Sequence, residues 1–278
     1  MKQRKALNIA VEAKLWKYNY WHNEAVKYAQ HIYSSDSIFS FIPKNASSTL
    51  RWSIAVDNGI LDVDCDIKWT TKPPNSWIFN PTLYYQLKNN YTFVILRCPY
   101  SRLASSYLDQ IVRKPHIYLT HWPKENILRT TLDPLMSRYV TFDRFVKKIR
   151  SNKNFLYGNA HWIPQFRFLL YDDYDDYFCV EEFGKVVDTL REKIGFKVYD
   201  TRKRLNHGID SLKKIEVPNP HKLNAKELLE MKNNGEIVNP KSLFTDEHIE
   251  IVKNLYAEDI DLYRSKFGEK NLMFPDTL

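Results

Sequence analysis

Two apolar runs, each followed by a basic residue and then by a helical pattern, constrain the fold of this chain more than any other feature. The runs are SIFSFI at residues 37–42 and TFVIL at residues 92–96. Continuous apolar runs of this length are typical of strands that are buried on both faces, as in parallel sheets. Two such strand–turn–helix units predict an α/β fold of three layers, in which helices flank a central, mainly parallel sheet.

The remaining segments predict how the chain is organised around these units. Residues 1–36 are charged and aromatic with weak helical periodicity, so we expect a helical lead-in there. Residues 37–278 contain no internal repeat, and we predict that they form a single α/β domain. The acidic segment YDDYDDY (171–177) indicates a solvated turn. Further helices are predicted over residues 142–149 with Thr141 as N-cap, over residues 181–194 up to a stop at Gly195, and as one long helix from Thr245 to Phe267.

Charge and cysteine content narrow the partners and the compartment. The formal net charge is +8, which favours anionic ligands. The basic residues are dispersed and form no tail, so we expect no nucleic-acid partner. No apolar stretch is long enough to cross a membrane, and none of the three cysteines has a metal-type spacing. We therefore expect a soluble, cytoplasmic protein without a metal ion.

The first strand–helix junction, PKNASST (43–49), has the composition of an anion site. Amide N–H groups at a helix N-terminus are unpaired donors and attract phosphate-like groups. Small side chains at Ala46, Ser47 and Ser48 would let an anion approach the backbone, and Lys44 adds a mobile positive charge. The alternative is that Ser47 or Ser48 only caps the helix and Lys44 is solvated.

The second junction follows the strand at residues 92–96. Arg97 closes this buried strand, where an arginine is costly unless it meets an anion or a carboxylate. Its planar guanidinium suits a phosphate group. Ser105 lies eight residues further on, inside the next helix. The alternative is that Arg97 pairs with a nearby acid such as Asp109.

Together the two junctions resemble the sulfotransferase family. PKNASST is similar to the loop that binds the 5′-phosphosulfate in that family, and LRCPYSRLASSY (96–107) is similar to its 3′-phosphate motif. The segments TFDRFVKKI (141–149), HWIPQ (161–165) and LYAEDIDLY (255–263) resemble the branch that sulfates carbohydrates. The resemblance implies a P-loop-like fold and the transfer of a sulfuryl group from 3′-phosphoadenosine 5′-phosphosulfate (PAPS) to a hydroxyl of a carbohydrate acceptor, with no metal.

The same resemblance implies roles for individual residues. Lys44 matches the lysine that contacts the bridging oxygen and the 5′-phosphosulfate, and Arg97 and Ser105 match the 3′-phosphate ligands. A loop over the nucleotide is expected around residues 202–208, where Arg204 or Asn206 would contact the 3′-phosphate or the adenine. The alternative is that these residues form an exposed basic turn. The residues that match the loop around the 5′-phosphosulfate are Lys44, Asn45, Ala46, Ser47, Ser48 and Thr49.

The catalytic base departs from the family's usual pattern. Many members use a histidine between the two phosphate motifs, but residues 45–96 contain none. His161 is the candidate base, with packing as its alternative role. His116 and His121 are weaker candidates, and the acidic residues Asp62, Asp64 and Asp66 are expected to form a surface turn.

Two other functions stay open at this stage. One is a nucleotide-binding or glycan-binding module that has kept the pocket and lost catalysis, since the usual histidine is missing. The other is a P-loop-like kinase, which would need a lysine directly before Ser or Thr and an acidic Mg²⁺ ligand. Lys44 instead lies three residues before Ser47, and no glycine occurs in the loop.

Overall fold

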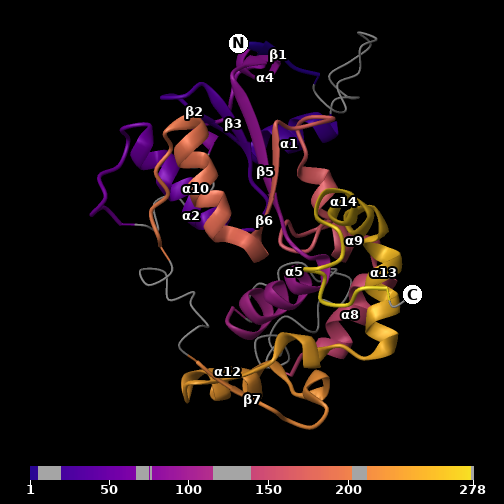
Figure 1. The fold of residues 1–278 in the computed structure, drawn as a ribbon. Helices are drawn as coiled ribbons and strands as arrows, with labels where there is room; N and C mark the ends of the chain where they lie inside the picture. The colour runs from indigo at the N-terminus through magenta and orange to yellow at the C-terminus, as the bar shows by residue number, and fades with distance from the viewer. Residues whose placement is uncertain (6–19, 67–74, 76, 115–138, 202–211, 277–278) are drawn as a thin grey trace, which may run out of the picture. The chain divides into compact units, whose positions relative to one another are not determined.

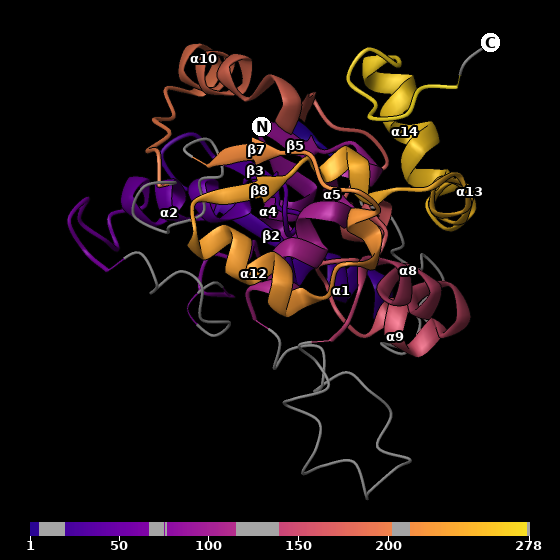
Figure 2. The same ribbon diagram turned by 90° about the horizontal axis from the view of Figure 1, so that it is seen from below.

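The structure is a computed structural model that describes residues 1–5, 20–66, 75, 77–114, 139–201 and 212–276. The chain forms two compact units and passes between them three times. The first unit comprises Met1–Arg97 and Gln165–Gly208, and the second comprises Cys98–Pro164 and Ile209–Leu278. Figures 1 and 2 show the helices and strands of both units.

The first unit holds the larger sheet and the helices that cover it. Its short strands β1 and β4 pair antiparallel with each other. The elements of the first unit are β1 (Lys2–Gln3), α1 (Tyr20–Lys27), β2 (Ala29–Ile32), β3 (Ser37–Ser40), α2 (Ser47–Asp57), α4 (Leu83–Leu87), β4 (Lys88–Asn89), β5 (Tyr91–Leu96), the 3-10 helices η5 (Gln165–Phe168) and η6 (Val180–Glu182), β6 (Asp176–Cys179) and α10 (Phe183–Ile194).

The sheet of the first unit has the strand order β2-β3-β5-β6 and is mixed. β3 pairs parallel with β5, and β5 pairs parallel with β6. β2 pairs antiparallel with β3 at the edge. The described part of the lead-in at residues 1–36 thus contributes strands as well as helix α1, which the weak helical periodicity did not indicate.

Aromatic side chains on one face of this sheet build the core of the first unit. Alternate residues of a strand point to the same face, so Phe39 and Phe41 of β3 and its extension lie beside Phe93 of β5. The rings of Phe39 and Phe93 stack with their centroids 4.8 Å apart. α2 and α10 cover this face, and α1 lies on the other side of the sheet (Figures 1 and 2). This packing holds the N-terminus of α2 at the carboxyl end of β3.

The second unit is mostly helical. Its strands β7 and β8 form a separate parallel pair. The elements of the second unit are α5 (Pro99–Ser106), the π-helix η3 (Tyr107–Val112), α8 (Phe142–Ser151), α9 (Lys153–Tyr157), β7 (Lys213–Ile215), the 3-10 helices η7 (Pro220–Lys222) and η8 (Pro240–Leu243), α12 (Ala225–Asn233), β8 (Glu236–Val238), α13 (Asp246–Leu255) and α14 (Ala257–Phe267).

Several local expectations are confirmed. α2 begins at Ser47, as the change of pattern there predicts. The hydroxyl of Thr141 accepts a hydrogen bond from an amide in the first turn of α8, and α10 ends at Ile194 with Gly195 as its C-cap, whose φ of 66° is left-handed. Glycine adopts this conformation without a steric cost, which is why it ends so many helices.

Two expectations about local structure are wrong. The single helix expected from Thr245 to Phe267 is broken into α13 and α14 at Tyr256, whose backbone (φ −117°, ψ 28°) is not helical. The Tyr256 side chain is buried and its hydroxyl donates to the carbonyl of Trp162 at 2.6 Å, so tertiary contacts override the helical period. The segment YDDYDDY is not a solvated turn throughout, because its Asp176 begins β6 and its first two tyrosines are buried.

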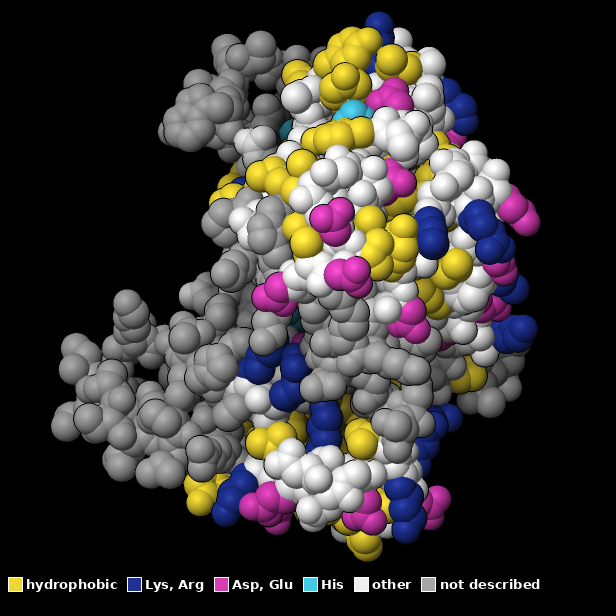
Figure 3. Space-filling view, turned by 90° about the vertical axis from the view of Figure 1, so that its left-hand side faces the viewer, with side chains coloured by type: hydrophobic (Ala, Val, Ile, Leu, Met, Phe, Trp, Pro, Cys, Tyr) yellow, Lys and Arg dark blue, Asp and Glu magenta, His cyan; other side chains and the backbone are white. Residues whose placement is uncertain are grey.

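The described surface mixes charges of both signs. On the face shown in Figure 3, lysine and arginine side chains are interspersed with aspartate and glutamate. Among the described residues, no helix is both long and apolar enough to span a membrane.

Candidate active site

The loop between β3 and α2 has an uncommon backbone for a chain segment without glycine. Lys44 has φ 74° and Ala46 has φ 55°, both in the left-handed region. This conformation costs a non-glycine residue about 1–2 kcal/mol, so the surroundings must enforce it. Turns of this kind curl the backbone so that its amide N–H groups can line a concave, anion-attracting surface.

The first turn of α2 starts directly from this loop. Ala46 is the N-cap residue and has no side chain that could cap the helix, while Ser47 is already helical. The alternative that Ser47 or Ser48 caps the helix therefore does not describe this N-terminus. Amide N–H groups in the first turn of a helix have no intrahelical acceptor and carry the positive end of the helix dipole. The geometry here suits an anion.

Asn45 holds the centre of the loop. Its side chain is fully buried, and Nδ2 donates to the carbonyl of Ile95 at 2.8 Å and to Oε1 of Gln165 at 2.6 Å. Its backbone N–H donates to the carbonyl of Ile42 at 3.1 Å and closes the turn. Asn45 thus ties the loop after β3 to the end of β5.

Arg97 lies at the carboxyl end of β5, next to that loop. Because β3 and β5 are parallel neighbours, the segments that follow them leave the sheet at the same end, where the carboxyl ends of the strands lie. The guanidinium of Arg97 donates through Nη1 to the backbone carbonyl of Lys44 at 2.9 Å. That carbonyl is neutral, so this bond orients the guanidinium without cancelling its charge.

Gln165 joins the same group and was missed by the sequence analysis as a site residue. Its Oε1 accepts from the backbone N–H of Arg97 at 3.0 Å, and its Nε2 donates to the Arg97 carbonyl at 2.8 Å. Gln165 is buried, so these bonds are shielded from water. The only hint in the sequence was its place at the end of the HWIPQ segment.

Arg51 is a second cation that the sequence analysis did not single out. It lies on α2, one turn after Ser47, and its guanidinium stacks over the ring of Phe41 at 4.7 Å. Burial lowers the pKa of Arg51 to about 10, an effect that Tyr28 opposes. The side chain therefore stays charged at neutral pH and adds a fixed positive charge to the helix that follows the loop.

Thr49 makes a contact of its own. Its side chain is buried and its hydroxyl shares a hydrogen bond of 2.8 Å with the hydroxyl of Thr201. Ser53, one turn further along α2, accepts from the backbone N–H of Tyr199 at 2.9 Å. These bonds fasten α2 to the segment that precedes the predicted nucleotide loop. Thr49 remains a predicted anion donor through its backbone N–H.

A model of the sulfotransferase family matches residues 37–264. The chain belongs to the sulfotransferase family. No curated protein and no solved structure was found to match it. The matched range contains both junctions, so the family and the geometry concern the same residues.

In this sulfotransferase chain, Ser105 lies on α5 in the second unit and is half-buried. Arg97 ends the first unit, so the pairing of these two residues on one phosphate stays a prediction. α5 also anchors residues 160–163 within the second unit. Arg102 of α5 donates to the carbonyls of Ile163 at 2.7 Å and Ala160 at 3.1 Å.

His161 is held in a defined orientation within the second unit. Its Nδ1 lies 2.7 Å from Oδ1 of Asn159, which also accepts the backbone N–H of His161 at 3.0 Å. An amide oxygen only accepts, so Nδ1 carries the proton and Nε2 of the neutral ring carries the lone pair. The backbone carbonyl of His161 accepts from the hydroxyl of Ser106 at 2.6 Å. This arrangement suits a proton acceptor.

Asp62, Asp64 and Asp66 are exposed, as expected for a surface acidic turn. Arg204, Asn206, His116 and His121 lie outside the described residues. Within the described ranges, no group of three histidine, cysteine or acidic side chains could hold a metal ion.

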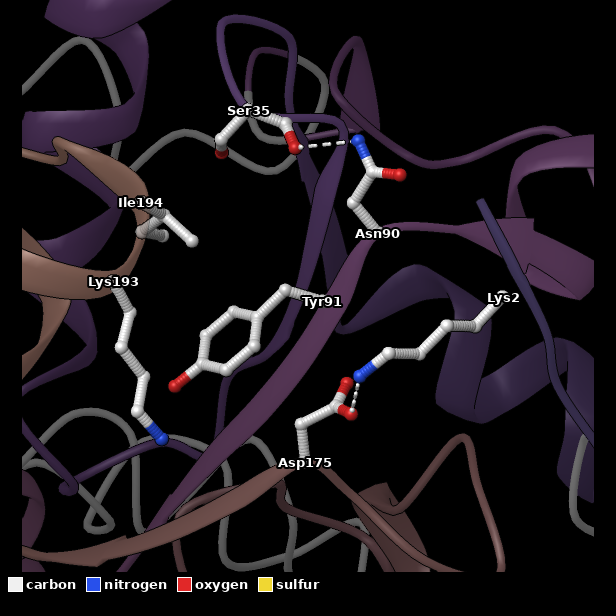
Figure 4. Close-up of a pocket in the computed structure, with 7 residues that line it drawn as sticks. All are labelled: Lys2, Ser35, Asn90, Tyr91, Asp175, Lys193 and Ile194. Carbon is white, nitrogen blue, oxygen red and sulfur yellow. Dashed lines mark hydrogen bonds and ion pairs between the residues drawn. The ribbon is translucent and has the colours of Figure 1, made fainter.

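A separate hollow lies at the other end of the same sheet. It has a volume of about 550 Å³, and the residues that line it include Ser35, Asn90, Tyr91 and Asp175 (Figure 4). Tyr91 begins β5 and Arg97 follows its last residue, so the length of the strand, about 20 Å, separates the hollow from the candidate loop. Its lysines are paired with carboxylates: Lys2 binds Asp175, and Lys193 binds Asp176.

Proposed function

We propose that this chain transfers a sulfuryl group from PAPS to a hydroxyl of a carbohydrate acceptor, and that its fold is P-loop-like. Membership of the sulfotransferase family supports the sulfuryl transfer. The observation that carries the rest is the contact between the two junctions, in which Arg97 donates to the backbone of Lys44. Two neighbouring cationic strand ends fit a ligand with two anionic groups on one nucleotide.

The residues of the first unit fit such a nucleotide. The uncapped first turn of α2 and the left-handed residues Lys44 and Ala46 present backbone donors for the 5′-anion. The Arg97 guanidinium supplies the planar donor pair that suits a phosphate. Ser105 keeps its proposed role as a further 3′-phosphate ligand. The residues around the loop therefore match a doubly charged adenosine ligand in charge and in donor type.

Sulfuryl transfer breaks the bond between sulfur and the leaving phosphate oxygen, forms a bond from the acceptor oxygen to sulfur, and leaves the electron pair on the phosphate. Negative charge thus grows on the leaving oxygen. Lys44 and the amides of the loop are proposed to stabilise that charge more strongly in the transition state than in the ground state. No step requires a metal ion.

His161 is the proposed acceptor of the proton from the acceptor hydroxyl. Asn159 fixes the tautomer in which Nε2 can take a proton, which is what a general base needs. Replacing His161 by Ala should lower kcat and leave the affinity for adenosine 3′,5′-bisphosphate (PAP, the desulfated product) unchanged. An unchanged kcat would remove His161 from catalysis.

A carbohydrate acceptor is proposed from three segments that resemble the carbohydrate branch. In the structure these segments are α8 with its Thr141 cap, the turn from His161 to Gln165, and the junction of α13 and α14 at Tyr256. The acceptor itself would be bound by loops, which vary most between relatives.

The test is a transfer assay with the full chain. The protein is incubated with PAPS labelled in its sulfuryl group and with a panel of unsulfated glycans, and a phenol and a steroid alcohol serve as non-carbohydrate acceptors. We expect label on at least one glycan, without added metal and not on the phenol or the steroid. Transfer only to a non-carbohydrate would overturn the acceptor class. No transfer, together with no binding of PAP, would overturn the function.

A further inference from the structure

The side-chain amide of Gln165 is bonded on both of its ends. Its Oε1 accepts from Nδ2 of Asn45 at 2.6 Å and from the backbone N–H of Arg97 at 3.0 Å. Its Nε2 donates to the carbonyl of Arg97 at 2.8 Å. Only one orientation of the amide satisfies these three bonds, because oxygen accepts and nitrogen donates. The Gln165 side chain is 1% exposed, so water does not compete for these bonds.

These three bonds connect the two parts of the candidate site. Asn45 lies between Lys44 and Ala46, the two residues with a left-handed backbone. Gln165 therefore contacts the strained loop on one side and the backbone of Arg97 on the other. Asn45 also donates directly to the carbonyl of Ile95, near the end of β5 and two residues before Arg97. Gln165, a side chain that contributes no charge, thus helps to set the distance between the loop and Arg97.

We propose that Gln165 is a positioning residue that holds the 5′-anion loop and Arg97 at the spacing of the two phosphates of one nucleotide. This inference rests on the proposed function, since it concerns how that same site grips its ligand. Two binding groups held in register act on one ligand at once, and the second contact then forms at a high effective concentration. When the spacing between the loop and Arg97 is no longer fixed, each group still binds its own phosphate, but the extra affinity from binding both phosphates at once falls.

The experiment compares two ligands that differ by one phosphate. The affinities of the full chain for PAP and for adenosine 5′-phosphate (AMP) are measured by calorimetry, and the ratio of their dissociation constants is the readout. A protein that is only partly folded binds both ligands more weakly by the same factor, so the ratio is unaffected. Loss of register lowers the affinity for PAP far more than that for AMP.

Two variants at Gln165 and one control are used. Gln165→Met keeps the length of the side chain and removes all three hydrogen bonds. Gln165→Glu keeps the shape, but replaces the donor to the Arg97 carbonyl with a buried negative charge. The control is Gln86→Met, because Gln86 is also buried in the first unit and donates through Nε2 to the carbonyl of Pro81 at 2.8 Å. Gln86 is on α4, away from the loop.

We expect wild type to bind PAP at least about thirtyfold more tightly than AMP, the scale of a charge-assisted contact. In Gln165→Met this advantage should fall roughly tenfold, while Gln86→Met keeps it within about twofold of wild type. In Gln165→Glu the preference for PAP over AMP should be lost at neutral pH. As the pH is lowered, the preference of this variant should approach that of wild type measured at the same pH. A protonated carboxyl group can again donate to the Arg97 carbonyl.

The outcomes separate the inference from the function on which it rests. If wild type does not prefer PAP to AMP, the proposed nucleotide site is wrong. If wild type prefers PAP and both Gln165 variants keep the full preference, the positioning role of Gln165 is overturned. If Gln86→Met loses the preference as strongly as Gln165→Met, the effect is a general one of the first unit and the inference is overturned as well.

Discussion

The two ends of the sheet in the first unit carry the same kinds of residue in different arrangements. At the amino end, Asp175 pairs with Lys2 and Arg4, and Asp176 pairs with Lys193. At the carboxyl end, the guanidinium of Arg97 donates to the backbone carbonyl of Lys44. At the amino end, each of these basic side chains therefore faces a carboxylate.

Under the proposed function, the carboxyl end of this sheet serves chemistry and the amino end serves structure. A carboxylate partner cancels charge and stabilises the fold, whereas a carbonyl or an amide only orients a cation. The same contrast appears in the backbone, because the left-handed residues Lys44 and Ala46 lie at the carboxyl end. Strain of this kind gathers at functional sites and is held in place by surrounding contacts. The two ends should therefore respond differently to the same substitution.

The largest difference is expected for a lysine at each end. Lys44→Ala should lower kcat for sulfuryl transfer by about 10²–10³, the scale for removing one donor to a developing oxyanion. Lys193→Ala, at the amino end, should change kcat by less than about twofold, since its partner is Asp176. Steady-state kinetics with saturating PAPS distinguish the two. Equal losses in both variants would erase the contrast.

An arginine at each end should differ in binding. Arg97→Ala is expected to weaken PAP binding by roughly 2–3 kcal/mol, the scale of a charge-assisted contact. Arg4→Ala removes a partner of Asp175 and should lower stability while leaving PAP affinity unchanged. Calorimetry gives the first quantity and urea unfolding the second. Unchanged PAP affinity in Arg97→Ala would remove Arg97 from the site.

At the amino end, lowering the pH should destabilise the fold by protonating Asp175. Burial acts to raise the pKa of Asp175, but hydrogen bonds from Arg4 and Lys2 outweigh it and hold the pKa at about 2. Because the folded pKa lies below the ordinary value of 3.8, the stabilisation is present above about pH 4 and is lost as the pH falls toward 2. Asp175→Asn should cost about 1–2 kcal/mol at neutral pH and lose less stability than wild type across that window. Urea unfolding at several pH values measures both quantities. If the free energy of unfolding of wild type and of Asp175→Asn changed with pH in parallel, the low pKa of Asp175 would be contradicted.

The smallest effect is expected at Ala46. Ala46→Gly removes the steric cost of a left-handed φ of 55° and should raise stability by about 0.5–1 kcal/mol. PAP affinity should fall by no more than about threefold, because the hydrogen bonds of Asn45 remain. Ala46→Val is the matched control and should destabilise the protein, since a β-branched residue tolerates this conformation poorly. A destabilised Ala46→Gly would show that the loop is not strained.

Local patterns predicted much of the fold. The run at residues 37–42 contains β3 (Ser37–Ser40), the run at 92–96 lies within β5 (Tyr91–Leu96), and the change of period at Ser47 marks the start of α2. Strands β2 and β6 could not be predicted in the same way. β2 has the sequence AQHI and β6 has DYFC, and neither has a long apolar run. β6 pairs with β5, which lies far away in the sequence, whereas β2 pairs antiparallel with β3, the next strand of the chain.

The candidate site shows the same division between local and distant information. Lys44 and Arg97 could be named from the sequence because each follows a recognisable strand. Gln165 could not, because its role depends on contacts with residues 68 and 120 positions away. The left-handed φ of Lys44 and Ala46 could not be predicted either, because glycine is the usual sequence signal for that conformation and neither residue is a glycine. The break at Tyr256 follows from a buried hydroxyl that no periodicity records.

The absence of glycine from the loop at residues 43–46 has a consequence for the kinetics of ligand capture. Every Cβ in such a segment removes backbone conformations that a glycine would sample, so less disorder has to be given up when a ligand arrives. A phosphate group should therefore bind to a loop whose backbone already has its bound conformation. Association would then be limited by diffusion and charge rather than by a slow rearrangement of the chain.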